Sequence, residues 1–257
     1  MSELKVTFLG TGTSMGVPVI GCDCNTCKSE DPKDNRLRTS ALIQKGDKNI
    51  VIDSGPDFRY QMLRSGIRSL EALIFTHEHK DHTAGMDDVR AFNFIQRRAV
   101  DVYASSDVEK VLRSDFHYAF ADTKYPGVPE INIHQISAQK EFYIGDLKIT
   151  PIQVYHHKMP VLGFRIEDFT YITDANYIPP EELKKIEGSK VLVLNALRQT
   201  KHISHFSLNQ AVELVSKLAP DRAYLTHISH QMGKHKEVSN LLPKSIEISY
   251  DQQVVVV

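Results

Sequence analysis

The sequence has almost no excess charge, no long apolar run and very few cysteines. There are 31 basic and 32 acidic residues, so the net charge of -1 gives no general attraction to nucleic acid or to acidic lipids. No apolar run approaches the length that crosses a bilayer, and no basic segment followed by an apolar one opens the chain. Three cysteines cannot form an even set of disulfides. We therefore expect a cytoplasmic protein that does not enter a membrane.

The chain of 257 residues is long enough to bury a large core as one domain. Strand and helix patterns alternate along it, without an internal repeat, a low-complexity tract or a linker. Strands are predicted at residues 5–9, 39–44, 49–53, 72–75, 100–104, 131–136, 147–155, 163–167, 169–173, 191–194 and 222–226, and around Ile246 and Val254. Helices are predicted at residues 56–64, 85–97, 106–118, 179–186 and 207–218. We expect one domain, residues 1–257, with strands and helices mixed throughout.

Two segments between these elements are predicted to be loops. Residues 22–35 are polar and rich in turn residues, which suggests a loop held by something other than apolar packing. Residues 122–129 contain proline and glycine, and we expect them to form a lid or a rim insertion.

Three histidines and an aspartate follow the apolar run 72–75 at close spacing, as His77, His79, Asp81 and His82. Imidazole and carboxylate donors together suit zinc, manganese or iron better than calcium or magnesium. A solvated loop that is merely rich in histidine is the alternative, but such a loop has no reason to follow a buried strand so closely. The segment therefore predicts a metal site.

Later strands are predicted to end at further metal-binding residues. His156, Asp174 and His227 each directly follow a predicted strand, as His77 nearly does. One histidine at the end of a strand is more often structural or solvated, but several such endings in one chain point to a shared site. The neighbouring His157 competes with His156, which we favour because it directly ends the strand. The whole set predicts a site with two metals.

This order of residues resembles the signature of the metallo-β-lactamase superfamily over nearly the whole chain. The resemblance implies an α+β fold whose four layers form an αβ/βα sandwich, with two divalent metals (zinc, manganese or iron) at one edge of the sheets. His77, His79 and His156 would bind the first metal. Asp81, His82 and His227 would bind the second, and Asp174 would bridge the two. Metals held in this way share and deprotonate a water molecule, so Asp81 and Asp174 also serve catalysis.

The cysteines indicate a subfamily. Cys22, Cys24 and Cys27 form a C-x-C-x-x-C motif, and a fourth ligand would close a structural zinc site. The PhnP-like cyclic-phosphate phosphodiesterases are similar, because they pair such a motif with a histidine three residues after the last catalytic ligand, which is His230 here. The resemblance implies one structural zinc that ties the N-terminal loop to the loop with His227. Reduced thiols without a metal are the alternative.

Three more histidines lie outside the expected ligand set. His205 precedes the predicted helix 207–218, where the phosphodiesterase branch of the superfamily carries a histidine that is not a ligand. The resemblance implies that His205 stabilises charge on the phosphoryl group and protonates the leaving alkoxide. His202 competes for this role. We expect His235 to be a surface histidine.

The resemblance implies a metal-dependent hydrolase of a small phosphodiester, such as a ribosyl cyclic phosphate or a cyclic nucleotide. A tRNA 3′-processing endoribonuclease shares the histidine cluster, but it usually carries a protruding basic arm, and no insertion here matches one. A non-catalytic metal-binding protein on the same scaffold is the third candidate, and His205 argues against it. Nucleic acid is therefore a less favoured partner, and a homodimer is expected from the resemblance alone.

Overall fold

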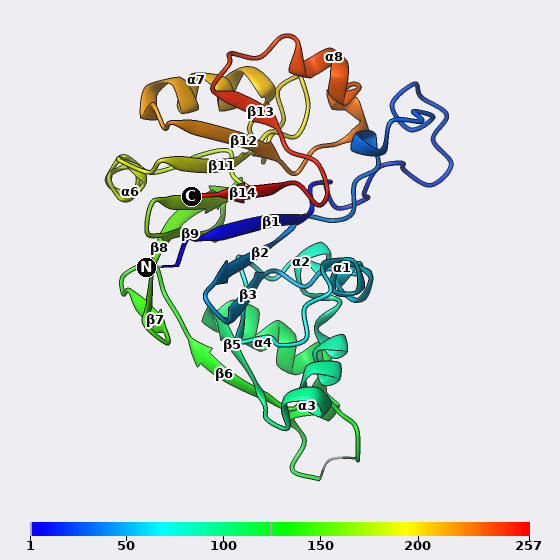
Figure 1. The fold of residues 1–257 in the computed structure, drawn as a ribbon, viewed down its shortest axis with the longest axis vertical. Coiled ribbons are helices and arrows are strands. Elements are labelled where there is room, and N and C mark those ends of the chain that lie inside the picture. The colour runs from blue at the N-terminus through cyan, green and yellow to red at the C-terminus, as the bar shows by residue number, and fades with distance from the viewer. Residues whose placement is uncertain (1, 124) are drawn as a thin grey trace.

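The computed structural model describes residues 2–123 and 125–257. In these residues the chain forms two seven-stranded sheets (Figure 1). The first sheet runs in the order β14 (Val254–Val256), β1 (Lys5–Gly10), β2 (Ser40–Lys45), β3 (Lys48–Ile52), β4 (Ala72–Ile74), β5 (Val100–Ala104) and β6 (Ile131–Gln135). The second runs in the order β13 (Ile246–Ile248), β12 (Arg222–Thr226), β11 (Val191–Asn195), β10 (Phe169–Ile172), β9 (Met159–Ile166), β8 (Leu147–His156) and β7 (Phe142–Ile144).

Helices flank the pair of sheets on both sides, as Figure 1 shows. On the side of the first sheet lie α1 (Phe58–Ser65), α2 (Lys80–Thr83), η2 (Met86–Val89), α3 (Arg90–Gln96), α4 (Ser106–Asp115) and α5 (His117–Phe120). On the side of the second lie α6 (Pro180–Ile186), α7 (Leu208–Leu218) and α8 (His235–Ser239), while the short 3₁₀ helices η1 (Pro32–Asp34) and η3 (His230–Met232) belong to loops. No helix within the two described ranges is long and apolar enough to cross a membrane.

Alternating side chains of the strands build three apolar layers. In β3, Ile50 and Ile52 face the core between the sheets, whereas Val51 faces α1, α3 and α4. In β11, Val193 faces the same central core and Leu192 faces the layer with α7. Both faces of each sheet are therefore buried, which explains why these strands are apolar throughout. The predicted four-layer αβ/βα sandwich is confirmed.

Several element boundaries differ from the prediction. The expected helix 85–97 begins with a 3₁₀ turn, η2, before α3, and the expected helix 106–118 breaks at Phe116 into α4 and α5. The strand expected at 163–167 begins earlier, at Met159, because β9 pairs with β8 along its whole length. The short elements β7 and α8 were not predicted. Ser207 and Gln210 form a capping box at the N-terminus of α7, the helix predicted at 207–218.

Candidate metal centre

The candidate ligands lie where strands of both sheets end. β3 and β4 are parallel neighbours, and so are β10, β11 and β12. Their carboxyl ends therefore meet at one edge of the sandwich. His77 follows β4, Asp174 follows β10 and His227 follows β12, while His156 is the last residue of β8. Segments far apart in the sequence thus deliver their side chains to one place.

Asp174 lies at the centre of the cluster. Its Oδ2 is 3.9 Å from Nε2 of His77, and its Oδ1 is 3.4 Å from Nε2 of His82 and 3.0 Å from Nδ1 of His227. The aspartate is buried and has a positive φ of 54°, which a non-glycine residue adopts only where its surroundings hold it. Asn195, at the end of β11, supplies such support, because its side-chain amide bonds both to the N–H and to the C=O of Ala175.

The cluster divides into two ligand groups that share Asp174. In one, the donor atoms of Asp81, His82, Asp174 and His227 all lie within 4.8 Å of one another. In the other, the same holds for His77, His79 and Asp174, and Nε2 of His77 is 3.1 Å from Nδ1 of His79. This is the donor set of a dinuclear site with a bridging carboxylate.

His156 lies slightly apart from the group formed by His77, His79 and Asp174. Its ring centroid is 5.1 Å from that of His79 and 6.0 Å from that of His77, and its donor atom groups with those of Asp174 and His205. Its Nδ1–H donates to the Ser204 carbonyl over 2.8 Å, so Nε2 is free to bind a metal. The competing residue, His157, is exposed in the β8–β9 turn.

The buried carboxylates of this cluster require cations. His82 is fully buried, and its Nε2 has no hydrogen-bond partner among the described residues although it lies 3.2 Å from Oδ2 of Asp81. Burial lowers the pKa of His82, but the charges of Asp174, Asp53 and Asp81 outweigh this effect and raise it well above its usual value. A positive charge is thus stabilised at this nitrogen, where a bound metal would supply it. The residues fit a pair of divalent cations.

Asp53 is a functional residue that the sequence analysis missed. It is fully buried, its Oδ2 accepts from Nδ1–H of His82 over 2.7 Å, and it also accepts the N–H and the hydroxyl of Thr76 over 2.8 Å each. Since the hydroxyl proton of Thr76 points to Asp53, its oxygen accepts from Nδ1–H of His77 over 2.9 Å. Both imidazoles are therefore oriented with Nε2 toward the cluster. Asp53 directly follows β3, so the signal that indicated Asp174 could also have indicated Asp53.

His205 lies against this cluster, and His202 lies farther out. The ring centroid of His205 is 4.4 Å from that of His156 and 4.9 Å from that of His227, whereas His202 contacts the ring of His205 at 5.3 Å. His205 is buried, and within residues 2–123 and 125–257 its Nδ1 has no hydrogen-bond partner. Burial and the neighbouring His227 lower its pKa to about 3, so its imidazole is neutral near pH 7.

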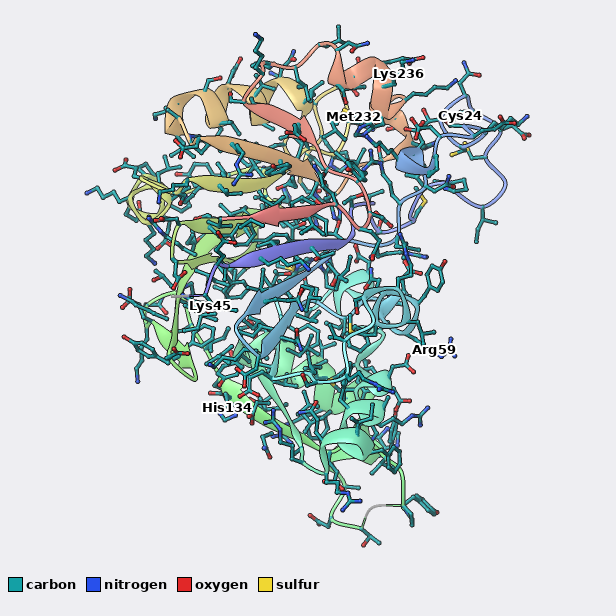
Figure 2. All side chains as sticks on the ribbon, viewed as in Figure 1. Cys24, Lys45, Arg59, His134, Met232 and Lys236 are labelled. Atoms are coloured by element: carbon teal, nitrogen blue, oxygen red, sulfur yellow. The ribbon has the colours of Figure 1, made fainter. Side chains whose placement is uncertain are left out.

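The three cysteines converge on His230, the first residue of η3. Sγ of Cys22 and Sγ of Cys24 lie 3.2 and 3.4 Å from Nδ1 of His230. A tetrahedral zinc separates sulfur and nitrogen ligands by about 3.5 Å, so these distances fit one. The Cys27 N–H lowers the pKa of Cys24 to about 6, whereas burial raises the pKa of Cys27 to about 11, so a bound cation is what would let Cys27 ionise beside Cys24. In Figure 2, Cys24 lies close to the segment that carries Met232 and Lys236.

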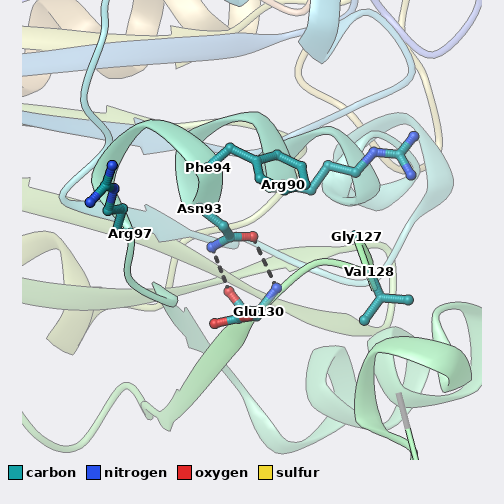
Figure 3. A pocket seen from close by; sticks show the side chains of 7 residues that line it. All are labelled: Arg90, Asn93, Phe94, Arg97, Gly127, Val128 and Glu130. Carbon is teal, nitrogen blue, oxygen red and sulfur yellow. Dashed lines mark hydrogen bonds between the residues drawn. The ribbon is translucent and has the colours of Figure 1, made fainter. Parts of the chain in front are cut away.

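Two expectations about the surroundings were wrong. His235 is not a surface residue: it is 8% exposed, its ring packs edge-on against Tyr250, and its N–H donates to Asp34. In the loop 122–129, of which residue 124 lies outside the described residues, Gly127 and Val128 line a pocket of about 380 Å³ beside α3. Figure 3 shows this pocket, to which no candidate ligand contributes, and Figure 1 shows the loop beyond α3, away from α2. The structure therefore does not support a lid over the metal centre.

Comparison with known proteins decides the family. A match to the family described as "Beta-lactamase superfamily domain" covers residues 48–228. The chain belongs to the metallo-β-lactamase superfamily. A crystal structure of a diphosphatase from the PhnP family matches 99% of this chain and 97% of its own, with a TM-score of 0.93 and 36% identity. The predicted resemblance to the PhnP-like branch of the superfamily is confirmed.

Two further relatives have different names. An octanoyltransferase of Porphyromonas gingivalis is 38% identical over 250 residues, which are 96% of this chain. This chain spans only 50% of that protein's length. Ribonuclease Z of Mycobacterium bovis is 23% identical over 267 residues, covering 91% of this chain and 89% of the relative. Family, fold and donor set together identify the chain as a metal-dependent hydrolase of the metallo-β-lactamase fold.

Proposed function

We propose that this protein is a phosphodiesterase that hydrolyses a small, cyclic phosphodiester. The observation that carries the proposal is the pair of ligand groups sharing Asp174, with the neutral, buried His205 beside them. When bound, two metals would neutralise the phosphate oxygens and supply a hydroxide near pH 7. Phosphodiesters carry negative charge and gain more from two cations than neutral amides or thioesters do.

Each residue of the site would have a distinct role. Asp174 holds the two ligand groups together, and Asp53 fixes the ring of His82. A neutral His205 can donate its N–H to the charge that develops on the phosphoryl group and the departing oxygen. Cys22, Cys24, Cys27 and His230 would bind a structural zinc, which would brace the loop that follows β12.

The similar proteins favour a phosphate ester as the substrate. The PhnP-family structure is named a diphosphatase, and a diphosphate, like a cyclic diester, presents a P–O bond flanked by charged oxygens. The name octanoyltransferase belongs to a protein of which this chain matches one half, so we do not extend it to this chain. Ribonuclease Z provides the second candidate, cleavage of pre-tRNA, on the observation that its sequence aligns with nearly the whole chain.

A substrate panel with metal analysis tests the proposal. The metal-loaded protein is assayed with bis-p-nitrophenyl phosphate, 2′,3′-cyclic nucleotides, ribosyl cyclic phosphate, a nucleoside diphosphate and pre-tRNA, each with wild type and His205→Ala. We expect turnover of at least one small cyclic diester that the substitution reduces. Cleavage confined to pre-tRNA would favour the endonuclease, and full metal content without turnover on any substrate would favour a binding protein.

A further inference from the structure

The turn that carries His227 needs support from its neighbours. The φ of His227 is 58°, in the left-handed region that non-glycine residues rarely adopt. Ile228 donates its N–H to the Thr11 carbonyl over 2.8 Å and accepts the Thr13 N–H over 3.1 Å. The hydroxyl of Thr13 also lies 3.2 Å from Nε2 of His227. The segment from Thr11 to Thr13 therefore holds both the backbone of this turn and the imidazole ring.

A second segment holds the other side of the ring. Oγ1 of Thr39 lies 3.2 Å from Nδ1 of His227 and donates its proton to the Gly12 carbonyl over 2.7 Å. The Thr39 N–H donates to the same carbonyl over 3.0 Å. The ring of His227 is thus bracketed by residues 11–13 and residues 37–39, which are also bonded to each other.

One carboxylate binds both of these segments. Asp251, in the turn between β13 and β14, accepts the N–H of Thr11 over 3.0 Å and its hydroxyl over 2.8 Å at Oδ1. Its Oδ2 accepts the N–H of Leu37 over 2.9 Å. The Asp251 side chain is 4% exposed, and 240 residues separate it from Thr11. The distant end of the chain therefore sets the spacing of the two segments around His227.

Arg36 completes this arrangement. Its guanidinium Nη1 donates to Oγ1 of Thr11 over 2.8 Å and to the Ser249 carbonyl over 2.5 Å. Because the Thr11 hydroxyl accepts from Arg36, its own proton is directed to Asp251. Burial raises the pKa of Asp251 to about 6 although Arg36 is nearby, so placing a carboxylate here is costly. An asparagine could not replace it without cost, because its amide NH₂ would face a backbone N–H.

We propose that Asp251 is a positioning residue for the metal ligand His227: it fixes residues 11–13 and 37–39 and, through them, the turn and ring that complete the second metal site. Asp251 itself belongs to none of the ligand groups. The inference rests on the proposed metal centre, in which His227 is a ligand, and it extends that centre to the β13–β14 turn.

The test measures metal affinity and does not depend on turnover. Zinc is titrated into the apo forms of wild type, His227→Ala and Asp251→Asn against a competing chelator, and native mass spectrometry counts the bound ions. We expect His227→Ala to lose one active-site ion. Asp251→Asn is expected to bind that same ion at least about tenfold more weakly, with the other active-site ion and the cysteine-bound zinc retained.

A matched control separates positioning from general loss of stability. Ser189→Ala removes a buried hydrogen bond of 2.7 Å to Thr170, at the starting ends of β10 and β11, and should leave all zinc affinities unchanged. Thr11→Val removes the hydroxyl's bonds to Asp251 and from Arg36 while keeping the backbone bonds, and gives a second reading if Asp251→Asn folds poorly; a smaller loss of the same ion is expected. Unchanged zinc affinity in the Asp251 and Thr11 variants would overturn the positioning role. Unchanged stoichiometry in His227→Ala would overturn the ligand assignment beneath it.

Discussion

Replacing Asp53 by asparagine tests whether this carboxylate orients His82, the candidate ligand whose Nδ1 it contacts. The fully buried carboxylate accepts from Nδ1–H of His82 over 2.7 Å and from two donors of Thr76 over 2.8 Å. An asparagine of the same shape has one acceptor oxygen, so its NH₂ must face either the Thr76 backbone N–H or the imidazole N–H together with the Thr76 hydroxyl. In addition, the negative charge that supports a cation at Nε2 of His82 disappears.

The expected size of the effect follows from substitutions of other residues that hydrogen-bond to a metal ligand. Loss of such a partner lowers metal affinity about 10- to 100-fold, equivalent to about 1.4 to 2.8 kcal/mol of binding free energy. The affinity is measured by zinc titration against a chelator, and the ions are counted by native mass spectrometry. We expect the ion bound by the group of Asp81, His82, Asp174 and His227 to be weakened most, because His82 belongs to that group.

Asp57→Asn is the control for this prediction. Asp57 lies four positions from Asp53 and pairs with Arg38, its Oδ1 lying 3.2 Å from Nη1 of Arg38. It undergoes the same change of charge and contacts no histidine of the cluster. Zinc affinity of Asp53→Asn within twofold of that of Asp57→Asn would refute the reasoning, because the carboxylate would then not contribute to the orientation of His82.

Four more predictions address other parts of the molecule. His205→Ala should reduce phosphodiester turnover about 10²- to 10³-fold in steady-state assays with metal content unchanged, and an unchanged rate would show that His205 has no catalytic role. Asp174→Ala should lose at least one active-site ion by mass spectrometry; two retained ions would contradict the bridging assignment. Cys24→Ser should lose one zinc that wild type binds, whereas equal stoichiometry would remove the structural site. Burial lowers the pKa of His235 to about 4, so the fold favours the neutral imidazole. This stabilising contribution, up to about 3 kcal/mol, is present above pH 6.5 and is lost as the pH falls toward 4. In urea unfolding, the difference in free energy of unfolding between wild type and His235→Gln should shrink over that range, and a constant difference would contradict the prediction.

The sequence indicated the residues that come together at the metal centre because they lie at or shortly after the carboxyl ends of strands. This local signal needs no knowledge of the topology beyond the shared edge of the sheets. It locates His77, Asp174 and His227; Asp53 was not indicated because the predicted strand 49–53 included it, whereas β3 ends one residue earlier, at Ile52. The metal-binding role of each residue stays a prediction that the titrations above will test.

Features that depend on distant partners could not be predicted. The burial of His235 results from packing against Tyr250 and from the bond to Asp34, and nothing in the five-residue helix α8 indicates either contact. Asp251 likewise has the appearance of an ordinary turn residue, because the donors it binds lie more than 200 positions away. The three-residue strand β7 exists only through its pairing with β8 and carries too short a pattern to be recognised alone.

The pairing of β14 with β1 has a consequence for how the protein is made and handled. Val256 pairs with Lys5, so one edge of β1 stays open until residues 254–256 have been synthesised. An unpaired strand edge is a template for association with other chains, so a stalled or nicked product lacking this strand would be prone to aggregate. A substitution in residues 254–256 that weakens this pairing would therefore expose the same edge of β1.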